Sequence, residues 1–424
     1  QAPPPSRPAL AICGPQWQRM PGLLPMRSLA VALLAVVLHA IWAGHLPVRL
    51  PLWTALAVAV AAAAAGLRRR FQQPRDVLME LAGAIQGEVP EDLRERAERQ
   101  AAKRAAARPP PTQEEELATL DVTPAPRFQL EDQGWLEHLD REGFAVLANV
   151  AGPADLARGE QLLWDLLEEK TSWRRGAPET WSDQAYERIG SVQNGLMNGQ
   201  GVGQSDFLWH MRTLPRVKQA FAKIWSTEEL LVSYDGGNVY RPWHHGFKKT
   251  VCGWWHVDQG KGKQGRHCVQ GLVSLFPADG TTGGLTVVPG SHLRHAEVVQ
   301  DMQNPVTDYC TVQPYEPLLQ ELPKRLVCCQ AGDLLLWDSR TVHANSPAPL
   351  TPTGPGDQLL RAVAYVCMTP KSLASSDVRR NRRAAYENHF STTHWPHELV
   401  LGEQGDKPPR SLAEAAPAVV DLVG

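Results

Sequence analysis

The sequence predicts a mainly β domain with packed helices, built as a jelly roll or barrel, in the second half of the chain. Beyond Leu230 the chain consists of seven or eight short apolar stretches that glycine and proline separate. Regular helices do not alternate with them, as they would in a parallel α/β sheet. The stretches include LLVSYDGG, TVCGWWHV, RHCVQGLVSLF, GGLTVVPGS, RLVCC, GDLLLWDS and RAVAYVCM.

Two apolar segments near the start predict an N-terminal hairpin within residues 25–70. Residues 28–47 and 50–67 are each close to the roughly 20 residues that cross a bilayer, and arginines flank them. The second is mostly alanine, which gains little in hydrocarbon. Three interpretations stay open: a membrane hairpin, a cleaved targeting segment and a soluble alanine-rich helix. Residues 1–24, which begin with Gln rather than Met, are expected to be an unstructured leader.

Residues 71–126 are expected to form a charged, proline-rich linker. The stretch EDLRERAERQAAKRAAA has no apolar stripe, so it predicts a solvated helix. Three consecutive prolines at 109–111 end this helix, and acidic residues follow them. We therefore expect the folded domain at 127–400 and a tail at 401–424.

Two helices are expected early in this domain. WLEHLDREGFAVLANV (135–150) reads as a short helix, a glycine break and an alternating strand. ADLARGEQLLWDLLEE (154–169) has leucines at helical spacing, which is typical of an amphipathic helix.

Composition excludes two classes of protein. The formal net charge is -2, so bulk charge indicates no nucleic-acid partner. The seven cysteines form an odd set without a C-x-x-C motif. This pattern disfavours a disulfide scaffold and favours a reducing compartment for the catalytic domain.

Several motifs are expected to carry no chemistry. GKGKQG (260–265) matches a dinucleotide-binding pattern, but a strand follows it, so we interpret it as a hairpin loop. The pairs His292/His295 and His394/His397 lack a second ligand pair, which predicts surface histidines rather than zinc sites. A G-x-S-x-G elbow is absent from the sequence, which disfavours a serine hydrolase.

The motif that predicts chemistry is GWWHVDQG. Residues i and i+2 of a strand share a face, so His256 and Asp258 point into one volume. His343 stands in GDLLLWDSRTVHAN, at the end of a strand of the buried type. Two histidines and one carboxylate form the facial triad that leaves one side of Fe(II) open for substrate and O₂. The absence of thiolate ligands favours iron over structural zinc.

At these motifs the chain resembles the phytanoyl-CoA dioxygenase-like (PhyH) family of Fe(II)/2-oxoglutarate oxygenases, over roughly residues 130–400. The resemblance is carried by His256-Val257-Asp258, GGLTVVPGSH, GDLLLWDSRTVHAN and RAVAYVCM. It implies a double-stranded β-helix (jelly-roll, cupin-like) core with helices on one sheet. It also implies Fe(II), O₂ and 2-oxoglutarate, which chelates iron, and a segment 377–398 that packs back on the domain.

The resemblance assigns the 2-oxoglutarate anchor to Arg361, which matches the family's arginine on the strand after the last ligand. A guanidinium pairs bidentately with a carboxylate. The interval from His343 to Arg361 is longer than the family's, and Val363 replaces a frequent hydroxyl residue. Asn345 is a further candidate for a polar contact to 2-oxoglutarate, and Arg340 is the alternative arginine.

Two more residues are candidates for the pocket. Gln270 is the polar member of the strand RHCVQGLVSLF that is expected to touch 2-oxoglutarate or substrate. Trp254 shares the face of the ligands and is expected at the pocket mouth, whereas Trp255 packs outward. Core packing stays open as the alternative for Trp254 and Gln270.

The expected activity is hydroxylation of a lipid-like or small organic substrate, with release of succinate and CO₂. The alternative is a catalytically inactive or regulatory domain that binds 2-oxoglutarate or another ligand on a membrane anchor. A third interpretation is a non-oxidative cupin-type enzyme such as an isomerase. Membrane association through residues 28–67, or targeting to an organelle, is the expected location.

Overall fold

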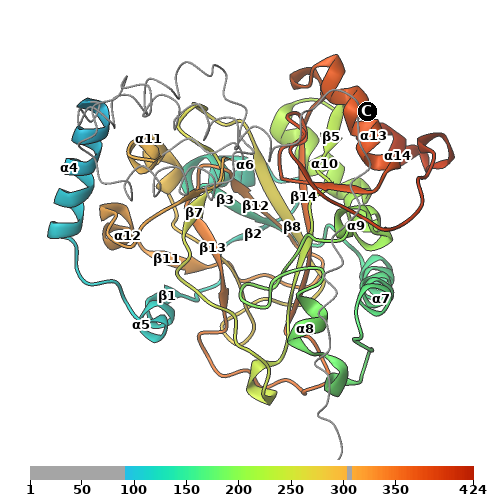
Figure 1. Ribbon diagram of the computed structural model, residues 1–424, viewed down its shortest axis with the longest axis horizontal. Helices are drawn as coiled ribbons and strands as arrows, with labels where there is room; N and C mark the ends of the chain where they lie inside the picture. Colours follow the sequence, from blue (N-terminus) through green and yellow to red (C-terminus); the bar gives the residue numbers. More distant parts are fainter. Residues whose placement is uncertain (1–90, 303–307) are drawn as a thin grey trace, which may run out of the picture. The chain divides into compact units, whose positions relative to one another are not determined.

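The computed structural model describes residues 91–302 and 308–424 (Figure 1). The expected leader (1–24) and the expected apolar hairpin (25–70), including the segment 28–67 proposed to meet a membrane, lie outside these residues. Among the helices that the structure describes, none is both long enough and apolar enough to span a bilayer.

The larger of the two main sheets has the strand order β2-β3-β12-β8-β14-β6-β4, and β5 pairs with the far end of β14. All its neighbours are antiparallel except β2 and β3. Its strands are β2 (Arg127–Phe128), β3 (Phe144–Leu147), β4 (Leu196–Met197), β5 (Leu230–Val232), β6 (Gly237–Tyr240), β8 (Val269–Ser274), β12 (Leu334–Asp338) and β14 (Arg361–Pro370).

The second sheet has the order β1-β11-β9-β13-β7-β10 and is antiparallel apart from the pair β1 and β11. Its strands are β1 (Leu120–Asp121), β7 (His256–Val257), β9 (Gly283–Val287), β10 (Cys310–Thr311), β11 (Lys324–Leu326) and β13 (His343–Pro347). A separate two-stranded sheet pairs β15 (Phe390–Thr392) with β16 (Leu401–Gln404).

The two main sheets pack face to face. One buried apolar cluster takes side chains from both sheets: Phe144, Val146, Leu272, Leu335, Trp337 and Val363 from the larger, and Leu285 and Val287 from the smaller. Burying each such side chain contributes about 1.5–3 kcal/mol. The prediction of a β core with packed helices is therefore confirmed as two mixed sheets with helices against them.

Helices cover the outer face of the larger sheet (Figure 1). α9 (Asp206–Arg212) and α10 (Pro215–Trp225) contact β14, α7 (Pro153–Lys170) contacts α9, and α6 (Gly134–Glu142) packs beside β3. The predicted leucine face of α7 is buried. The two helices expected before residue 170 are thus confirmed.

The remaining helices are short or peripheral. The α-helices are α4 (Glu91–Ala106), α5 (Gln113–Ala118), α8 (Asp183–Tyr186), α11 (His295–Val299), α12 (Pro317–Glu321), α13 (Ser376–Glu387) and α14 (Pro417–Val423). The 3₁₀ turns are η1 (Pro178–Thr180), η2 (Val202–Gln204), η3 (Trp243–His245), η4 (Ser291–Arg294), η5 (Lys371–Leu373) and η6 (Leu412–Glu414).

The described part of the expected linker 71–126 is folded. Thr112 and Glu115 form a capping box that starts α5. Glu116 is buried and accepts hydrogen bonds from Trp255 Nε1 (2.7 Å) and Lys324 Nζ (2.9 Å). The folded unit therefore begins before residue 127. The charge of Glu116, which the local sequence places in solvent, is paired inside the protein.

The expected tail 401–424 also packs on the domain. β16 pairs with β15, and Leu422 and Val423 of α14 are buried. The buried guanidinium of Arg382 on α13 donates to the carbonyls of both residues. The segment 377–398 therefore packs back on the domain, as the resemblance implies, and the residues after it do so as well.

The four histidines predicted at the surface, His292, His295, His394 and His397, are buried. Each has a ring nitrogen within hydrogen-bond distance of a backbone carbonyl or a hydroxyl, which replaces water and permits burial. The prediction of exposure was wrong. Among the described residues, no metal-binding group contains any of the four. GKGKQG (260–265) forms a loop before β8, as predicted, but the loop is not a hairpin, because β7 and β8 belong to different sheets.

Candidate metal centre

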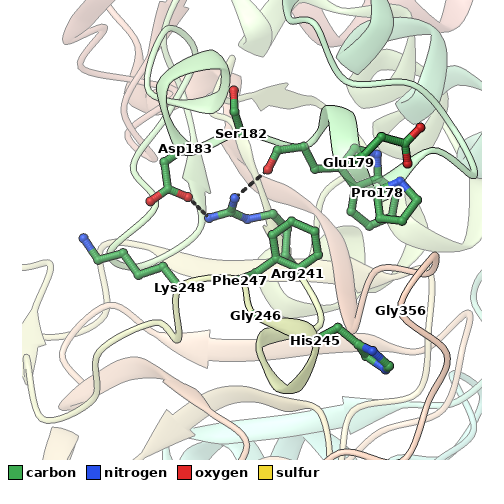
Figure 2. A pocket seen from close by; sticks show the side chains of 11 residues that line it. Pro178, Glu179, Ser182, Asp183, Arg241, His245, Gly246, Phe247, Lys248 and Gly356 are labelled. Carbon is green, nitrogen blue, oxygen red and sulfur yellow. Dashed lines mark hydrogen bonds and ion pairs between the residues drawn. The ribbon is translucent and has the colours of Figure 1, made fainter.

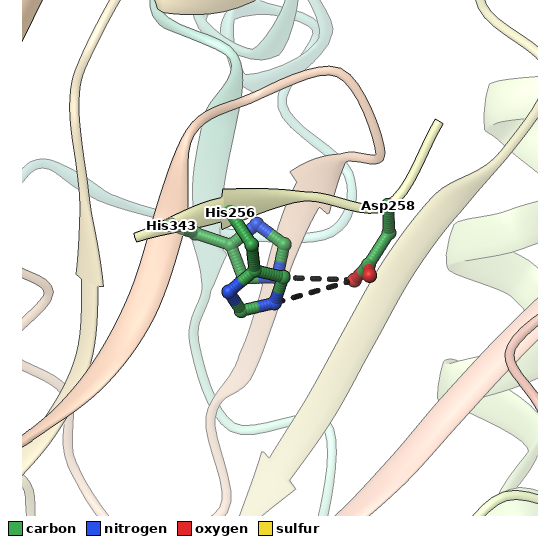
Figure 3. A group of neighbouring side chains, drawn as sticks. All are labelled: His256, Asp258 and His343. Carbon is green, nitrogen blue, oxygen red and sulfur yellow. Dashed lines mark ion pairs between the residues drawn. The ribbon is translucent and has the colours of Figure 1, made fainter. Parts of the chain in front are cut away.

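Strand pairing brings the three predicted ligands together (Figure 3). β7 is only two residues long, and its pairing with β13 places His343 directly opposite His256. Asp258 follows β7, where its backbone N–H donates to the carbonyl of Ser339 (2.9 Å). All three side chains are buried.

The spacing of the ligand atoms suits a single metal ion. Asp258 Oδ2 lies 3.2 Å from His343 Nε2 and 3.7 Å from His256 Nε2. Ligands at right angles around a divalent ion, each about 2.1 Å from it, lie about 3 Å apart. Three such ligands occupy one face of an octahedral ion and leave the opposite face open.

The second ring nitrogen of each histidine is held by a backbone carbonyl. His343 Nδ1 is 2.9 Å from the carbonyl of Thr341, and His256 Nδ1 is 3.2 Å from that of Trp254. A carbonyl only accepts, so Nδ1 carries the proton and the Nε2 lone pair faces Asp258. Burial, with help from His343, lowers the pKa of His256 to about 3, so this ligand is neutral near pH 7.

The carboxylate is prepared for a cation. Burial opposes ionisation of Asp258, but the surrounding histidines outweigh it and hold the pKa well below its usual value. Gln270 Nε2 donates to Asp258 Oδ2 at 2.8 Å. Gln270 lines the cavity as expected, and it also orients the carboxylate, a role that the sequence did not predict.

A cavity of about 280 Å³ opens over the triad. Its aromatic lining residues are Trp254, Tyr309, Trp337 and Tyr365, and its polar ones include Asp235 and His394. Most of its walls come from the two main sheets, and residues 391–394 and 402 close one side.

Two aromatic rings pack against the first ligand. The Trp254 ring stacks on His256 with centroids 5.0 Å apart and an interplanar angle of 8°. Tyr309 lies 4.7 Å from the same imidazole and is 42% exposed, which places it at the mouth. Trp254 therefore lines the cavity, while Trp255 turns away to Glu116.

Arg361 lies behind the cavity wall rather than on it. Its Nη1 donates to Asn238 Oδ1 (2.6 Å), and its guanidinium carbon is 5.2 Å from the Tyr240 ring centroid. Arg361 Nε and the Tyr240 hydroxyl are buried without a hydrogen-bond partner among the described residues. Two unused donors around a cation fit a carboxylate such as that of 2-oxoglutarate.

Asn345 and Tyr365 connect the metal ligands to this cation. Asn345 lines the cavity two residues after His343, and its Nδ2 donates to the Tyr365 hydroxyl (3.0 Å). Tyr365 and Arg361 are four apart on β14 and therefore share a face. The anchoring roles of Arg361 and Asn345 stay predictions.

The role of Arg340 as the alternative arginine also stays a prediction. Its guanidinium forms two hydrogen bonds to Asp338, at 2.9 and 2.8 Å, and it does not line the cavity. Arg266 also binds this carboxylate (2.9 Å). Arg340 is thus held by a structural ion pair at the end of β12.

The cavity residues that the sequence did not predict include Tyr365, Asp235, Tyr309 and His394. Tyr365 could have been found, because it shares a strand face with Arg361. Asp235 and Tyr309 come from loops without a motif, and His394 belongs to a histidine pair that was predicted at the surface, so tertiary packing alone brings these residues to the cavity.

A larger hollow of about 870 Å³ lies elsewhere and shares no lining residue with this cavity. Figure 2 shows Arg241 among its lining residues, paired with Asp183 and with the carbonyl of Trp181. The buried cation of this hollow, Arg241, is therefore already paired within the protein.

Comparison with known proteins supports the same chemistry. The family model "Phytanoyl-CoA dioxygenase (PhyH)" matches residues 139–348. The "Ava biosynthesis cluster protein O" of Aspergillus versicolor is 28% identical over 302 residues, which cover 68% of this chain and 92% of that protein.

Two solved structures resemble the chain at low identity. One is the epimerase SnoN with Fe³⁺, α-ketoglutarate and nogalamycin RO (18% identity, 56% of this chain and 83% of that one, TM-score 0.40). The other is EctD from S. alaskensis with 2-oxoglutarate and 5-hydroxyectoine (16%, 63% and 83%, TM-score 0.40).

The matched segment contains all three residues of the triad. The family match and the buried His-Asp-His group together confirm Fe(II), 2-oxoglutarate and O₂ as the cofactors that the sequence predicts. The chain therefore carries a domain of the phytanoyl-CoA dioxygenase (PhyH) family.

Proposed function

We propose that the chain is an Fe(II)- and 2-oxoglutarate-dependent dioxygenase, on a double-stranded β-helix scaffold, that hydroxylates a small organic substrate. The observation that carries this proposal is the buried triad of His256, Asp258 and His343 beneath a cavity of about 280 Å³. A lipid-like substrate was inferred from residues 28–67, which lie outside the described residues, so the proposal keeps the small substrate.

Bound iron supplies the oxidative decarboxylation of 2-oxoglutarate to succinate and CO₂, coupled to oxygen insertion into a C–H bond. The protein's part is to position and shield the reactants. Gln270 holds Asp258 Oδ2, and two carbonyls fix the ring orientations of the histidines. Arg361, with the Tyr240 hydroxyl, is the proposed anchor for the distal carboxylate of 2-oxoglutarate.

A domain that only binds ligands would not need the open metal face that the triad leaves. An isomerase of the cupin type would not need a buried cation with unused donors behind the cavity. Both alternatives predict no succinate, so succinate release separates them from the proposal.

The test uses the full chain, purified without oxygen and supplied with Fe(II), 2-oxoglutarate and air. We expect succinate from the wild type and from His267→Ala, a histidine whose ring, among the described residues, binds only the Gln264 carbonyl. His343→Ala should reduce succinate to background. If Fe(II) does not bind the wild type, the triad is not a metal site. If Fe(II) binds but calorimetry detects no binding of 2-oxoglutarate, the proposed dioxygenase activity is ruled out.

A further inference from the structure

One wall of the cavity over the triad carries an acidic side chain that the proposed function does not use. Asp235 lies between β5 and β6 and lines the cavity together with His394. Apart from the metal ligand Asp258, it is the only acidic residue among the described residues that line this cavity. No lysine or arginine lies among them.

The main chain around Asp235 is closely packed and hydrogen-bonded. A Cβ on Gly236 would lie 1.7 Å from the carbonyl oxygen of Met197, so this position in the turn accepts only glycine. The buried guanidinium of Arg212 donates to the backbone carbonyls of Asp235 and Gly203. These bonds hold the main chain and leave the carboxylate itself free.

The Asp235 carboxylate has little compensation within the protein. Its Oδ1 accepts one hydrogen bond, from the Gly236 N–H at 2.7 Å, and no lysine or arginine in the described residues forms an ion pair with it. Burial raises the pKa of Asp235, and the opposing effects of the Gly236 N–H, His394 and Arg212 do not cancel this rise. A partly buried carboxylate without an ion-pair partner is costly, and a positively charged ligand offsets that cost.

The rest of the cavity suits the same kind of ligand. Trp254 and Tyr309 line it beside the metal ligands. Aromatic rings attract cations within about 6 Å, and tryptophan does so most strongly. A cavity of about 280 Å³ that also receives 2-oxoglutarate leaves room only for a small group.

We propose that Asp235 binds a protonated amine of the substrate, so that the enzyme acts on a small basic amine rather than on an anion. This inference rests on the proposed function for its reaction, and on Asp235, Trp254 and Tyr309 for its specificity.

The test measures binding without turnover. The full chain, loaded with Fe(II) and 2-oxoglutarate under argon, is titrated calorimetrically near neutral pH with cyclohexylammonium, cyclohexanol and cyclohexanecarboxylate. We expect cyclohexylammonium to bind at least about tenfold more tightly than cyclohexanol, and the carboxylate to bind most weakly. Asp235→Asn should bring the amine and the alcohol within about twofold of each other.

Asp377→Asn is the matched control, because it removes an exposed carboxylate on α13 and changes the net charge equally. It should keep the wild-type preference. Cyclohexanol or cyclohexanecarboxylate that binds the wild type as tightly as the amine overturns the proposal, as does a wild type that binds none of the three. This comparison needs no variant, so it decides the question even if Asp235→Asn fails to fold.

Failure here is separable from failure of the proposed function. If succinate is released but the wild type shows no preference for the amine, the dioxygenase proposal stands and the role of Asp235 is ruled out. If the wild type prefers the amine, Asp235→Asn loses that preference and no succinate is released, the role of Asp235 stands and the dioxygenase proposal fails.

Discussion

At the scale of single residues, Gln270 should control how tightly the site holds its metal. Its amide donates to Asp258 Oδ2 at 2.8 Å, the oxygen that also faces both histidines. Gln270→Leu keeps similar bulk but removes that donor, so the carboxylate loses its orientation. We expect Fe(II) affinity, measured by anaerobic calorimetry, to fall by about 10–100-fold.

Gln161→Leu provides the comparison for this substitution. Gln161 is exposed on α7 and donates to Asp165 (2.7 Å), so its loss should leave Fe(II) affinity unchanged. Equal affinities in Gln270→Leu and the wild type would show that Asp258 is held without the amide.

The two candidate arginines make opposite predictions for 2-oxoglutarate. Arg361 is buried beside unused donors, whereas Arg340 is paired with Asp338. Removing one partner of a buried charged pair costs about 2–5 kcal/mol, so Arg361→Gln should weaken calorimetric binding of 2-oxoglutarate by at least about 30-fold. Arg340→Gln should change it by less than about twofold. The reverse ranking would reassign the anchor.

At the scale of elements, the turn between α6 and β3 supports the metal centre. Gly143 has φ 82°, and a Cβ there would lie 2.5 Å from Thr341 Oγ1 and from His292 Nδ1. Its carbonyl accepts from Thr341 Oγ1 (2.9 Å), and the Thr341 carbonyl binds His343 Nδ1. Gly143→Ala should therefore lower the free energy of unfolding in urea by about 2–4 kcal/mol, from backbone strain plus overpacking.

Gly265→Ala separates the two causes. Gly265 has nearly the same φ, 74°, but nothing lies within 4 Å of its added Cβ. Strain alone should cost about 1–2 kcal/mol there. If both variants lose the same free energy, crowding against Thr341 and His292 contributes nothing.

Local patterns predicted the elements that are continuous apolar runs, and long-range pairing decided the rest. GDLLLWDS and RAVAYVCM became β12 and β14, since such runs have few alternatives to a buried strand. β7 contains only His256 and Val257, and its pairing with β13 makes it a strand. α11 and α12, five residues each, are too short for helical periodicity to show.

The candidate site divides in the same way. The three ligands were predictable because a strand places i and i+2 on one face and because His343 follows a buried strand. The structure places His343 at the start of β13 rather than at the end of that buried strand, β12. Asp235 was not predictable, because its role depends on the absence of lysine and arginine from the described residues that line the cavity. Composition and motifs carry no information about such complementarity.

At the scale of the whole molecule, buried histidines set how stability depends on pH. Burial lowers the pKa of His138, His292, His295, His389 and His397, and each has lost the water that would solvate its charged form. Surface histidines, as the sequence predicted for His292, His295 and His397, would make no such contribution. The protein should therefore lose stability in mild acid even where no ion pair is broken.

His397 allows this to be measured at one position. Burial, and then the charge of Lys263, lowers its pKa to about 4, against about 6.5 in the unfolded chain. Between these values the unfolded state binds more protons, so the contribution is complete above about pH 6.5 and is lost as the pH falls toward 4. From about pH 7 to about pH 5 the loss is about 2 kcal/mol.

The variant His397→Asn tests this contribution, because its amide can still reach Thr369 Oγ1. Over this pH interval, the free energy of unfolding in urea should fall by about 2 kcal/mol less for the variant than for the wild type. Equal slopes for His397→Asn and the wild type would mean that His397 is protonated in the folded protein as readily as in the unfolded chain.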